Sequence, residues 1–231
     1  QTKNHNFFAN GILVHNSLIK VVKVSDQEIL VSTNGVIDAF KCELNSQIGS
    51  PYDNFGELFW EAVRNQMVDC GRSLDDTDHV EWLADKLLPN VTYMFELCSP
   101  YNRVIVPHKE IKLYFHGWRD NISLNEMPFV ECDLISAFPI PKIYSLKSLD
   151  ECLAATQVMP WDEEGYVVVD KNFNRVKIKS PAYLLVHRLA NNGNMSSKRA
   201  IELWIEGDYE EVLAYFPEYR PTFDKIQQSF D

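Results

Sequence analysis

The stretch from Glu163 to Tyr183, EEGYVVVDKNFNRVKIKSPAY, decides how the rest of the chain is organised. Three consecutive valines, residues 167–169, predict a β-strand, and residues 176–178 predict a second strand after an asparagine-rich turn. Pro181 then favours the start of a helix, because the N–H that proline lacks makes no hydrogen bond in the first helical turn. The stretch therefore predicts a β-hairpin that leads directly into a helix.

Two lysines lie on one face of the second predicted strand. Lys177 and Lys179 are two residues apart, so their side chains point to the same side. The repulsion between neighbouring ammonium groups is offset if an anion, such as a polyphosphate, lies between them. Glu164, at the head of the first strand, could hold a divalent ion or a sugar hydroxyl while the lysines hold phosphate. An exposed strand with solvated lysines is the alternative.

Glu96 is a second candidate, because it is the lone charge in an apolar strand. Residues 93–106 read YMFELCSPYNRVIV. A carboxylate on such a strand is costly unless it is paired or functional. The alternative is that Glu96 points to solvent from the opposite face of the strand.

Composition limits the classes of function. The chain has 231 residues, of which 45% are hydrophobic, enough for one large domain or two small ones. No apolar run approaches the ~18 residues of a membrane span, so no membrane partner is expected. The net charge of −11 argues against a protein that coats nucleic acid, but not against an enzyme with a local basic groove. Five scattered cysteines without a C-x-x-C pair indicate reduced thiols in a cytoplasm and argue against a zinc site.

The remaining pattern predicts a strand-rich part, residues 17–180, followed by a helical part, residues 181–231, so the expected fold class is α+β. A short hinge near residues 191–194 would join the parts if they do not pack together. Strands are expected at residues 17–24, 28–33, 92–98, 103–106 and 111–115, and helices at residues 55–68, 76–88, 148–159, 183–190, 197–206, 209–215 and 222–230.

The first 16 residues, QTKNHNFFANGILVHN, differ in character from the rest of the chain. Two short apolar strands flank an Asn-Gly turn, a strong hairpin signal. At the end of the segment, the Asn16 side-chain amide can attack its own backbone carbonyl and cleave the chain. The neighbouring His15 can supply a proton, and Ser17 can accept an acyl group. An ordinary hairpin is the alternative.

The complete string resembles the C-terminal end of an intein, from HNFFANGI to the junction HN followed by Ser. The resemblance implies that His5 and His15 assist the reaction and that Asn16 cyclises. It also implies that Ser17 is the first residue of the interrupted host protein. Since the chain begins at Gln1 and holds only 16 intein residues, we expect the downstream half of a split intein or a truncated sequence.

From Ser17 to about Phe223, four short motifs in order resemble the phage-type RNA ligase 1 family of ATP-dependent covalent nucleotidyltransferases. The segment EGYV at 164–167 resembles motif IV, and KIK at 177–179 resembles motif V, extended to K-x-K-x-x-x-Y by Tyr183. The segments FELCSPYNRVIV and LYFHGWRDN resemble motif III and the region after it, and EVLAYFPEYRPTF resembles the helical tail of phage members.

This resemblance implies an adenylation domain of antiparallel sheets flanked by helices, followed by a small helical region. It also implies an enzyme that uses ATP and Mg²⁺ or Mn²⁺ to join RNA 5′-phosphate and 3′-hydroxyl ends in a host cytoplasm. Lys177 and Lys179 would neutralise charge on the α-phosphate, and Glu96 would accept from a ribose hydroxyl. Glu164 would hold the metal or orient the nucleophilic lysine. Tyr183 would support the phosphate site.

Three positions depart from the family pattern or remain open. Motif I, K-x-D-G-S/T, is missing, and Ser17-Leu18-Ile19 resembles only the residues that come after it. We therefore expect the nucleophilic lysine on an upstream partner, with the intein inserted between the Gly and Ser of motif I. Asn34 stands where members often carry Lys or Arg. Arg119 is a candidate nucleotide contact, with a surface ion pair as the alternative.

Two other readings stay open. The chain could be a catalytically silent fragment that only complements another chain. It could also belong to a DNA ligase or a capping enzyme, although no downstream run of short strands predicts the OB-type barrel expected there.

Overall fold

The computed structural model describes residues 6–8, 18–44, 49–75, 77–103, 105–128, 131–189 and 195–230. The strands are β1 (Asn6–Phe8), β2 (Leu18–Ser25), β3 (Glu28–Ser32), β4 (Val91–Cys98), β5 (Lys112–Asp120), β6 (Glu126–Met127), β7 (Ile143–Tyr144), β8 (Gly165–Val169) and β9 (Arg175–Lys179). The helices are α1 (Phe55–Asp69), α2 (His79–Ala84), α3 (Leu149–Thr156), α4 (Pro181–Leu189), α5 (Ser197–Glu206), α6 (Tyr209–Tyr215) and α7 (Arg220–Phe230).

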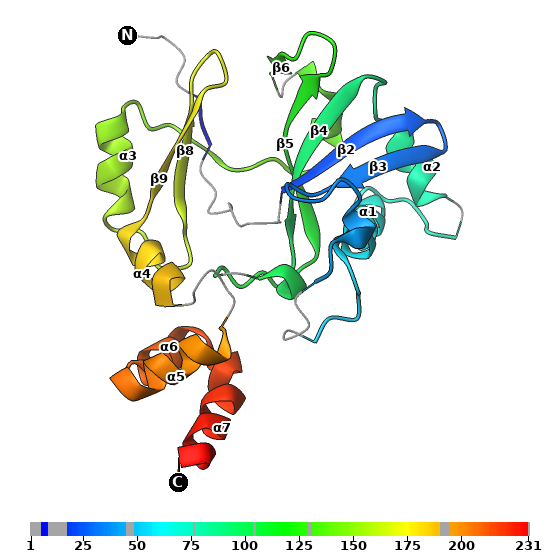
Figure 1. The fold of residues 1–231 in the computed structure, drawn as a ribbon. Coiled ribbons are helices and arrows are strands. Elements are labelled where there is room, and N and C mark those ends of the chain that lie inside the picture. Colours follow the sequence, from blue (N-terminus) through cyan, green and yellow to red (C-terminus); the bar gives the residue numbers. More distant parts are fainter. Residues whose placement is uncertain are drawn as a thin grey trace.

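The strands form two antiparallel sheets, and the last helices form a tail (Figure 1). The larger sheet has the order β3-β2-β4-β5-β6, and the smaller sheet has the order β7-β1-β8-β9. The α+β class with antiparallel sheets flanked by helices is therefore confirmed.

The larger sheet buries one face against α1. Alternate residues of β2 and β4, such as Val21 and Phe95, are fully buried there together with Phe59 of α1. The helix begins where the sequence offers a cap: the Asn54 side chain accepts a hydrogen bond from the Glu57 backbone N–H at 2.9 Å. Since side chains alternate along a strand, the opposite face of β4 is free to carry polar groups.

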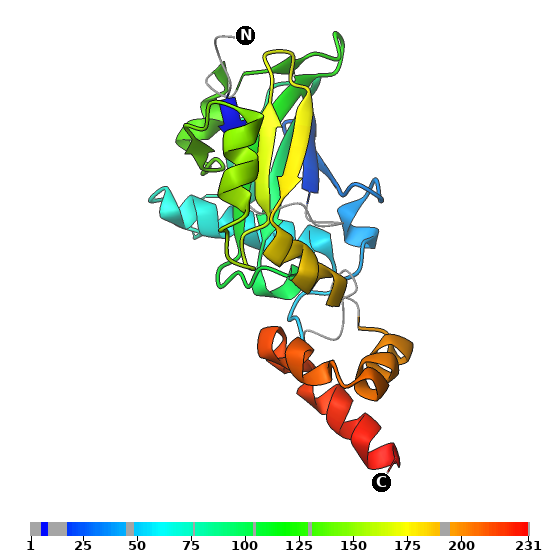
Figure 2. The same ribbon diagram turned by 90° about the vertical axis from the view of Figure 1, so that its left-hand side faces the viewer.

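The smaller sheet is built on the predicted hairpin. The backbone pairs Gly165 with Lys179 and Val167 with Lys177, and the Asp170 carboxylate accepts bonds from two backbone N–H groups of the turn. Ile178 of β9 packs with α3, which lies over this sheet in Figure 2. The two lysines therefore point away from α3. The backbone of β1 pairs with both β7 and β8.

The helical tail has its own core, to which α4 also contributes. Tyr183 and Val186 of α4 pack with buried residues of α5, α6 and α7, and with Ile105 from the loop after β4. The strand predicted at residues 103–106 is wrong. Instead, the Arg103 side chain donates to its own loop at Ile105 O (3.0 Å) and to Tyr215 O at the end of α6 (3.2 Å).

Removing the Arg103 side chain should loosen the tail. The guanidinium also pairs with Glu218 at 2.7 Å, so Arg103→Ala is expected to lower the local stability of α6 by about 2 kcal/mol. Hydrogen exchange of the α6 amides measures this loss. The Arg220–Glu210 pair, at 3.7 Å with both side chains more than half exposed, supplies the control, because Glu210→Gln should change exchange little. Equal protection in both variants would contradict an anchoring role for Arg103.

Most other predicted elements are confirmed, with shifted ends. The helix predicted at 76–88 is only α2, because the Asp78 carboxylate accepts from the backbone N–H groups of Val80 and Glu81 and starts the helix there. The strand predicted at 111–115 continues to Asp120. The Asn-Gly turn and the apolar strand after it, and the hinge at 191–194, lie outside the described residues. All five cysteines are free, and no described helix has the length and hydrophobicity needed to cross a bilayer.

Candidate functional site

Of the two candidate lysines, Lys179 is half-buried beside a candidate carboxylate, whereas Lys177 is exposed on β9, as the alternative of a solvated lysine expects. Lys179 Nζ is 2.7 Å from Glu164 Oε1, because the register of the hairpin brings the end of β9 next to the head of β8. The same ammonium group lies 5.3 Å from the centroid of the Tyr183 ring. Glu164 is buried, with 5% of its surface exposed. An isolated buried carboxylate would be costly, so the nearby ammonium group stabilises its charged form.

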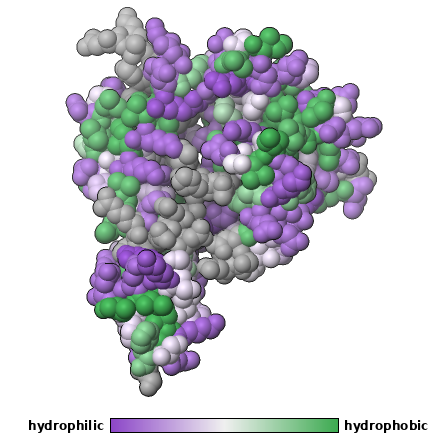
Figure 3. All heavy atoms as spheres, in the orientation of Figure 1, coloured by the Kyte–Doolittle hydropathy of each residue, from purple (hydrophilic) through white to green (hydrophobic). Residues whose placement is uncertain are grey.

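Glu96 joins this group from the larger sheet. It is 1% exposed, so the alternative in which it points to solvent is wrong. Partial burial lowers the pKa of Lys177, and the nearby Lys179 ammonium group lowers it further. The carboxylates of Glu164 and Glu96 act in the opposite direction and raise this pKa. Both carboxylates act electrostatically on Lys177, so β4 and β9 carry their charged groups towards the same region. We call Glu96, Glu164, Lys177, Lys179 and Tyr183 the inter-sheet site. Figure 3 shows hydrophilic residues over much of the surface of both halves in this view.

Tyr183 closes the site from the first turn of α4. Burial raises the pKa of its phenol well above the ordinary value, and the charges of Glu164 and Glu96 raise it further. Its backbone N–H donates to Ser180 Oγ at 3.3 Å, which fixes the residue at the start of the helix. The phenol therefore remains neutral and can act as a hydrogen-bond donor at physiological pH.

Arg119 is not brought to the inter-sheet site. On β5 it lies opposite Thr92, four residues before Glu96 along β4, which corresponds to about 13 Å. Its side chain is exposed, and within the described part of the chain it forms no ion pair. The surface ion pair considered for Arg119 is therefore not seen, and its nucleotide contact stays a prediction.

The intein residues cannot be placed. His5, His15, Asn16 and Ser17 lie outside the described residues, so their roles stay predictions. Asn34 is described and exposed. It lies in a turn closed by a hydrogen bond from the Thr33 backbone N–H to Val36 O at 2.9 Å, which is a role that asparagine suits.

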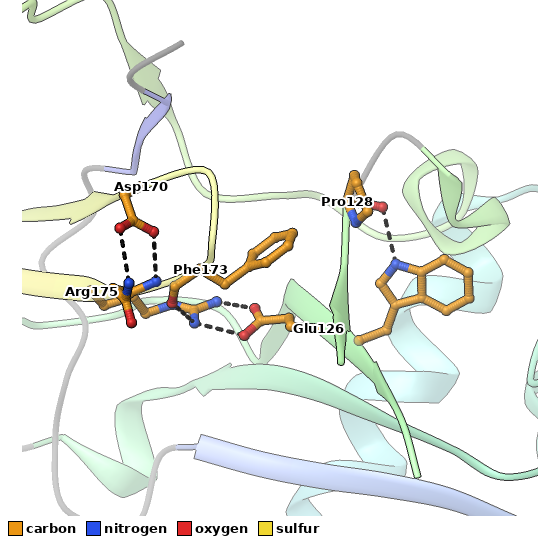
Figure 4. A network of polar contacts seen from close by, with 7 residues as sticks. Glu126, Pro128, Asp170, Phe173 and Arg175 are labelled. Carbon is orange, nitrogen blue, oxygen red and sulfur yellow. Dashed lines mark hydrogen bonds and ion pairs between the residues drawn. The ribbon is translucent and has the colours of Figure 1, made fainter. Parts of the chain in front are cut away.

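Two further residues of the site region were missed from the sequence. Arg175 extends the lysine series on β9 by the same two-residue step, so the alternation itself could have identified it. Its guanidinium forms a bidentate contact with the Glu126 carboxylate of β6 (Figure 4). His116 is the extra residue of a bulge in β5, and its Nε2 lies 3.9 Å from Glu96 Oε2. No sequence signal marks such a bulge.

The pKa of His116 should make stability depend on pH. Burial, assisted by the nearby Arg175 charge, lowers it from 6.5 to about 4. Between these values the unfolded chain binds more protons than the folded chain, so stability falls as the pH drops from 6.5 towards 4. We expect a loss of about 1–2 kcal/mol, less than the whole shift would give, because 28% of the side chain is exposed. His116→Gln should remove this part of the pH dependence of urea unfolding, and parallel curves for both proteins would contradict it.

The carboxylates suit a metal ion that is shared with a ligand. No cluster of three or more His, Cys, Asp or Glu side chains occurs among the residues that the structure describes. Mg²⁺ is commonly held by one or two protein carboxylates together with substrate phosphates. Glu164, with Glu96 close enough to act on the same lysine, fits that pattern and does not form a closed protein cage.

Comparison with known proteins decides the family. An RNA ligase family model matches residues 9–183, about three quarters of the chain and every residue of the inter-sheet site. The chain belongs to this RNA ligase family. The resemblance noted from the motifs is thereby confirmed at the level of the family.

Two kinds of relative resemble this RNA ligase chain. A viral protein of Autographa californica nuclear polyhedrosis virus, named as a bifunctional polynucleotide kinase/RNA ligase, is 34% identical over 128 residues, which are 54% of this chain and 18% of the relative. A Naegleria gruberi RNA ligase variant with AMP and Mn has a TM-score of 0.51 at 14% identity, over 80% of this chain and 52% of that chain. Another with ATP and Mn has a TM-score of 0.49 at 13% identity, over 80% and 51%.

The identity and coverage of these relatives limit what can be inferred from them. At such low identity, the Naegleria gruberi structure with AMP and Mn supports the fold alone. This RNA ligase chain spans about half the length of that structure and less than a fifth of the viral relative.

Proposed function

We propose that this chain is the downstream part of an ATP-dependent RNA ligase that joins RNA 5′-phosphate and 3′-hydroxyl ends. The observation that carries the proposal is the inter-sheet site. It places the Lys179 Nζ 2.7 Å from the buried Glu164 carboxylate, with Lys177 on the same face of β9, inside the segment matched by the RNA ligase family. A nucleotide offers the complementary groups, namely phosphates for the cations and hydroxyls for a carboxylate.

In this proposal the lysines of β9 bind the phosphates. Negative charge builds on the α-phosphate during nucleotidyl transfer, and fixed cations stabilise it best in a partly desolvated site. Lys177 is exposed on β9, so it is accessible to a phosphate from solvent. Lys179 is held by Glu164 and is therefore positioned before the substrate arrives.

Glu96 and Tyr183 would bind other parts of the nucleotide. A buried carboxylate that can accept from a ribose hydroxyl gives a strong, charge-assisted hydrogen bond. Tyr183 is neutral and 1% exposed. Its ring lies against the ammonium group of Lys179 and keeps water from that side of the site.

Glu164 would be the protein ligand of a Mg²⁺ or Mn²⁺ ion, or would orient the nucleophilic lysine. When bound, such an ion neutralises phosphate charge and orients the leaving pyrophosphate. The residue is suited to either task because it is buried and already paired with a lysine.

The nucleophilic lysine is proposed to lie on an upstream partner. That lysine attacks the α-phosphate of ATP and releases pyrophosphate, AMP then passes to the RNA 5′-phosphate, and the 3′-hydroxyl finally attacks and releases AMP. Residues 1–16 would be the end of an intein, in which His5 and His15 assist cyclisation of Asn16. Splicing would then join Ser17 to the upstream motif.

This chain alone should not form a lysyl-AMP adduct. Incubation with radiolabelled ATP followed by acid precipitation is expected to leave the chain unlabelled, because none of its described lysines occupies motif I. The chain reassembled with an upstream ligase fragment should become labelled. A lysine-linked AMP adduct on the isolated chain would show that the nucleophile is misplaced in this proposal.

Two alternatives make different predictions. A catalytically silent complementing fragment would not bind ATP, whereas the proposed site should bind it even without the nucleophile. A DNA ligase or capping-type enzyme would not seal 5′-phosphorylated RNA after reassembly. Activity on RNA is the proposal favoured by the family match, and we also propose a cytoplasmic setting.

A further inference from the structure

Arg175 and Glu126 connect the two sheets directly. The guanidinium donates from Nη1 to Glu126 Oε2 at 2.7 Å and from Nη2 to Glu126 Oε1. The two residues are 49 positions apart in the sequence, one on β9 of the smaller sheet and the other on β6 of the larger. The Glu126 side chain is only 12% exposed. A bidentate pair to a carboxylate with so little access to water fixes both distance and orientation.

Both ends of this contact are held by their own surroundings (Figure 4). Arg175 also donates to Phe173 O at 3.0 Å, within a turn that the Asp170 carboxylate organises. On the other side, the strand that carries Glu126 is followed by Pro128, whose carbonyl accepts from Trp118 Nε1 at 3.0 Å. Because both residues are held in place, the Arg175–Glu126 contact can fix the position of β9 relative to β6, which a contact between two mobile side chains could not.

The contact lies on the same side of the sheets as the inter-sheet site. Arg175 shares its face of β9 with Lys177 and Lys179. Its charge acts on His116, whose imidazole lies 3.9 Å from Glu96. The Arg175–Glu126 contact and the proposed nucleotide contacts therefore both lie between the larger and the smaller sheet.

We propose that the Arg175–Glu126 pair is a latch that sets the distance between β9 and β4, and so positions Lys177 and Lys179 relative to Glu96. This inference rests on the proposed function. A nucleotide held by phosphate at one sheet and by ribose at the other needs a fixed separation, and misplacement by about 1 Å can cost about 100-fold in rate. Arg175 is thus a positioning residue. Glu126 and Phe173 accept three hydrogen bonds from its guanidinium, so we assign it to positioning and not to phosphate.

Equilibrium binding of ATP with MgCl₂ to the whole chain, measured by titration calorimetry, tests the latch. Glu126→Gln and Arg175→Lys keep size or charge but lose the bidentate pair. Each is expected to weaken ATP binding about tenfold. The Arg64–Glu61 pair within α1, at 2.7 Å, is the matched control, and Glu61→Gln should leave affinity unchanged. Circular dichroism checks that each variant is folded.

A charge swap distinguishes a latch from a phosphate ligand. Arg175→Glu and Glu126→Arg are each expected to weaken binding, whereas the double variant restores the pair and should recover most of the affinity. If Arg175→Lys binds ATP as well as the wild type and the swap fails to recover affinity, Arg175 contacts phosphate and the latch is overturned. Wild-type affinity in Glu126→Gln overturns it as well. If the wild-type chain does not bind ATP, the proposed function itself fails.

Discussion

Lys177→Ala should reduce adenylation and ligation by at least about 100-fold in the ligase reassembled with its upstream part. The substitution removes an ammonium group that lies within the field of both Glu96 and Glu164 and that we assign to the α-phosphate. Without it, one carboxylate in the site loses part of its compensation and the charge building on phosphorus is less well stabilised. Single-turnover transfer of labelled AMP to protein measures the first step separately from sealing.

The hairpin offers a matched control for this experiment. Lys171 lies in the turn between β8 and β9 and is exposed, so Lys171→Ala removes the same charge from the same hairpin outside the inter-sheet site. It should keep nearly wild-type rates. Wild-type adenylation by Lys177→Ala, or an equal loss in Lys171→Ala, would remove the phosphate-binding role from Lys177. Glu164→Ala is expected to be as severe as Lys177→Ala.

Gly165→Ala should be the most destabilising single-methyl change at the site. The Gly165 backbone has φ +138°, and a Cβ there would lie 1.9 Å from Ile178 O on the neighbouring strand. Both the strained conformation and the contact with backbone must be relieved by separating β8 from β9. We expect a loss of at least about 3 kcal/mol in the free energy of unfolding, measured by urea denaturation.

Gly71→Ala is a control that separates the cost of backbone strain from the cost of a steric clash. Gly71 also has a positive φ, +74°, but nothing lies within 4 Å of the position that an alanine methyl group would occupy. Gly71→Ala should therefore cost only about 1–2 kcal/mol, the penalty for a left-handed residue. If the two variants unfold at the same urea concentration, the close approach of β8 and β9 at Gly165 is not a tight constraint in solution.

The sequence predicted the parts of the fold that depend on local patterns. The β8–β9 hairpin and helices α5 and α6 match the expected ranges, because side-chain alternation, turn residues and caps are all local signals. The strand at 103–106 failed because Arg103 takes its partners from α6, more than 100 residues away. Such a contact leaves no periodic trace in the sequence.

The sequence grouped the candidate residues that lie within one hairpin, but it could not place the residues that come from other strands. Lys177, Lys179 and Glu164 could be grouped because they lie within one hairpin. Glu96 was a candidate as the lone charge in an apolar strand, but only the family motif grouped it with the lysines, since nothing local indicates which strand will face it. The role of Arg119 stays a prediction, because a motif gives order along the chain and does not give distance along a strand.

The boundary at residue 16 remains a prediction. The backbone of β1, at Asn6–Phe8, lies between β7 and β8 in the smaller sheet, and the RNA ligase family match begins at residue 9. If residues 1–16 are excised as proposed, a different segment must take the place of β1 in the spliced ligase, because among the described strands β7 and β8 are joined through β1.

Tyr183 belongs to two parts of the molecule at once. Its ring lies beneath the Lys179 ammonium group, and the same side chain is buried in the core shared by α4 to α7. Truncating the chain after α4 would strip the covering from that ring and let water reach the underside of Lys179. The tail therefore shields the proposed phosphate site from water, and separating the tail from α4 would expose apolar surface on both parts.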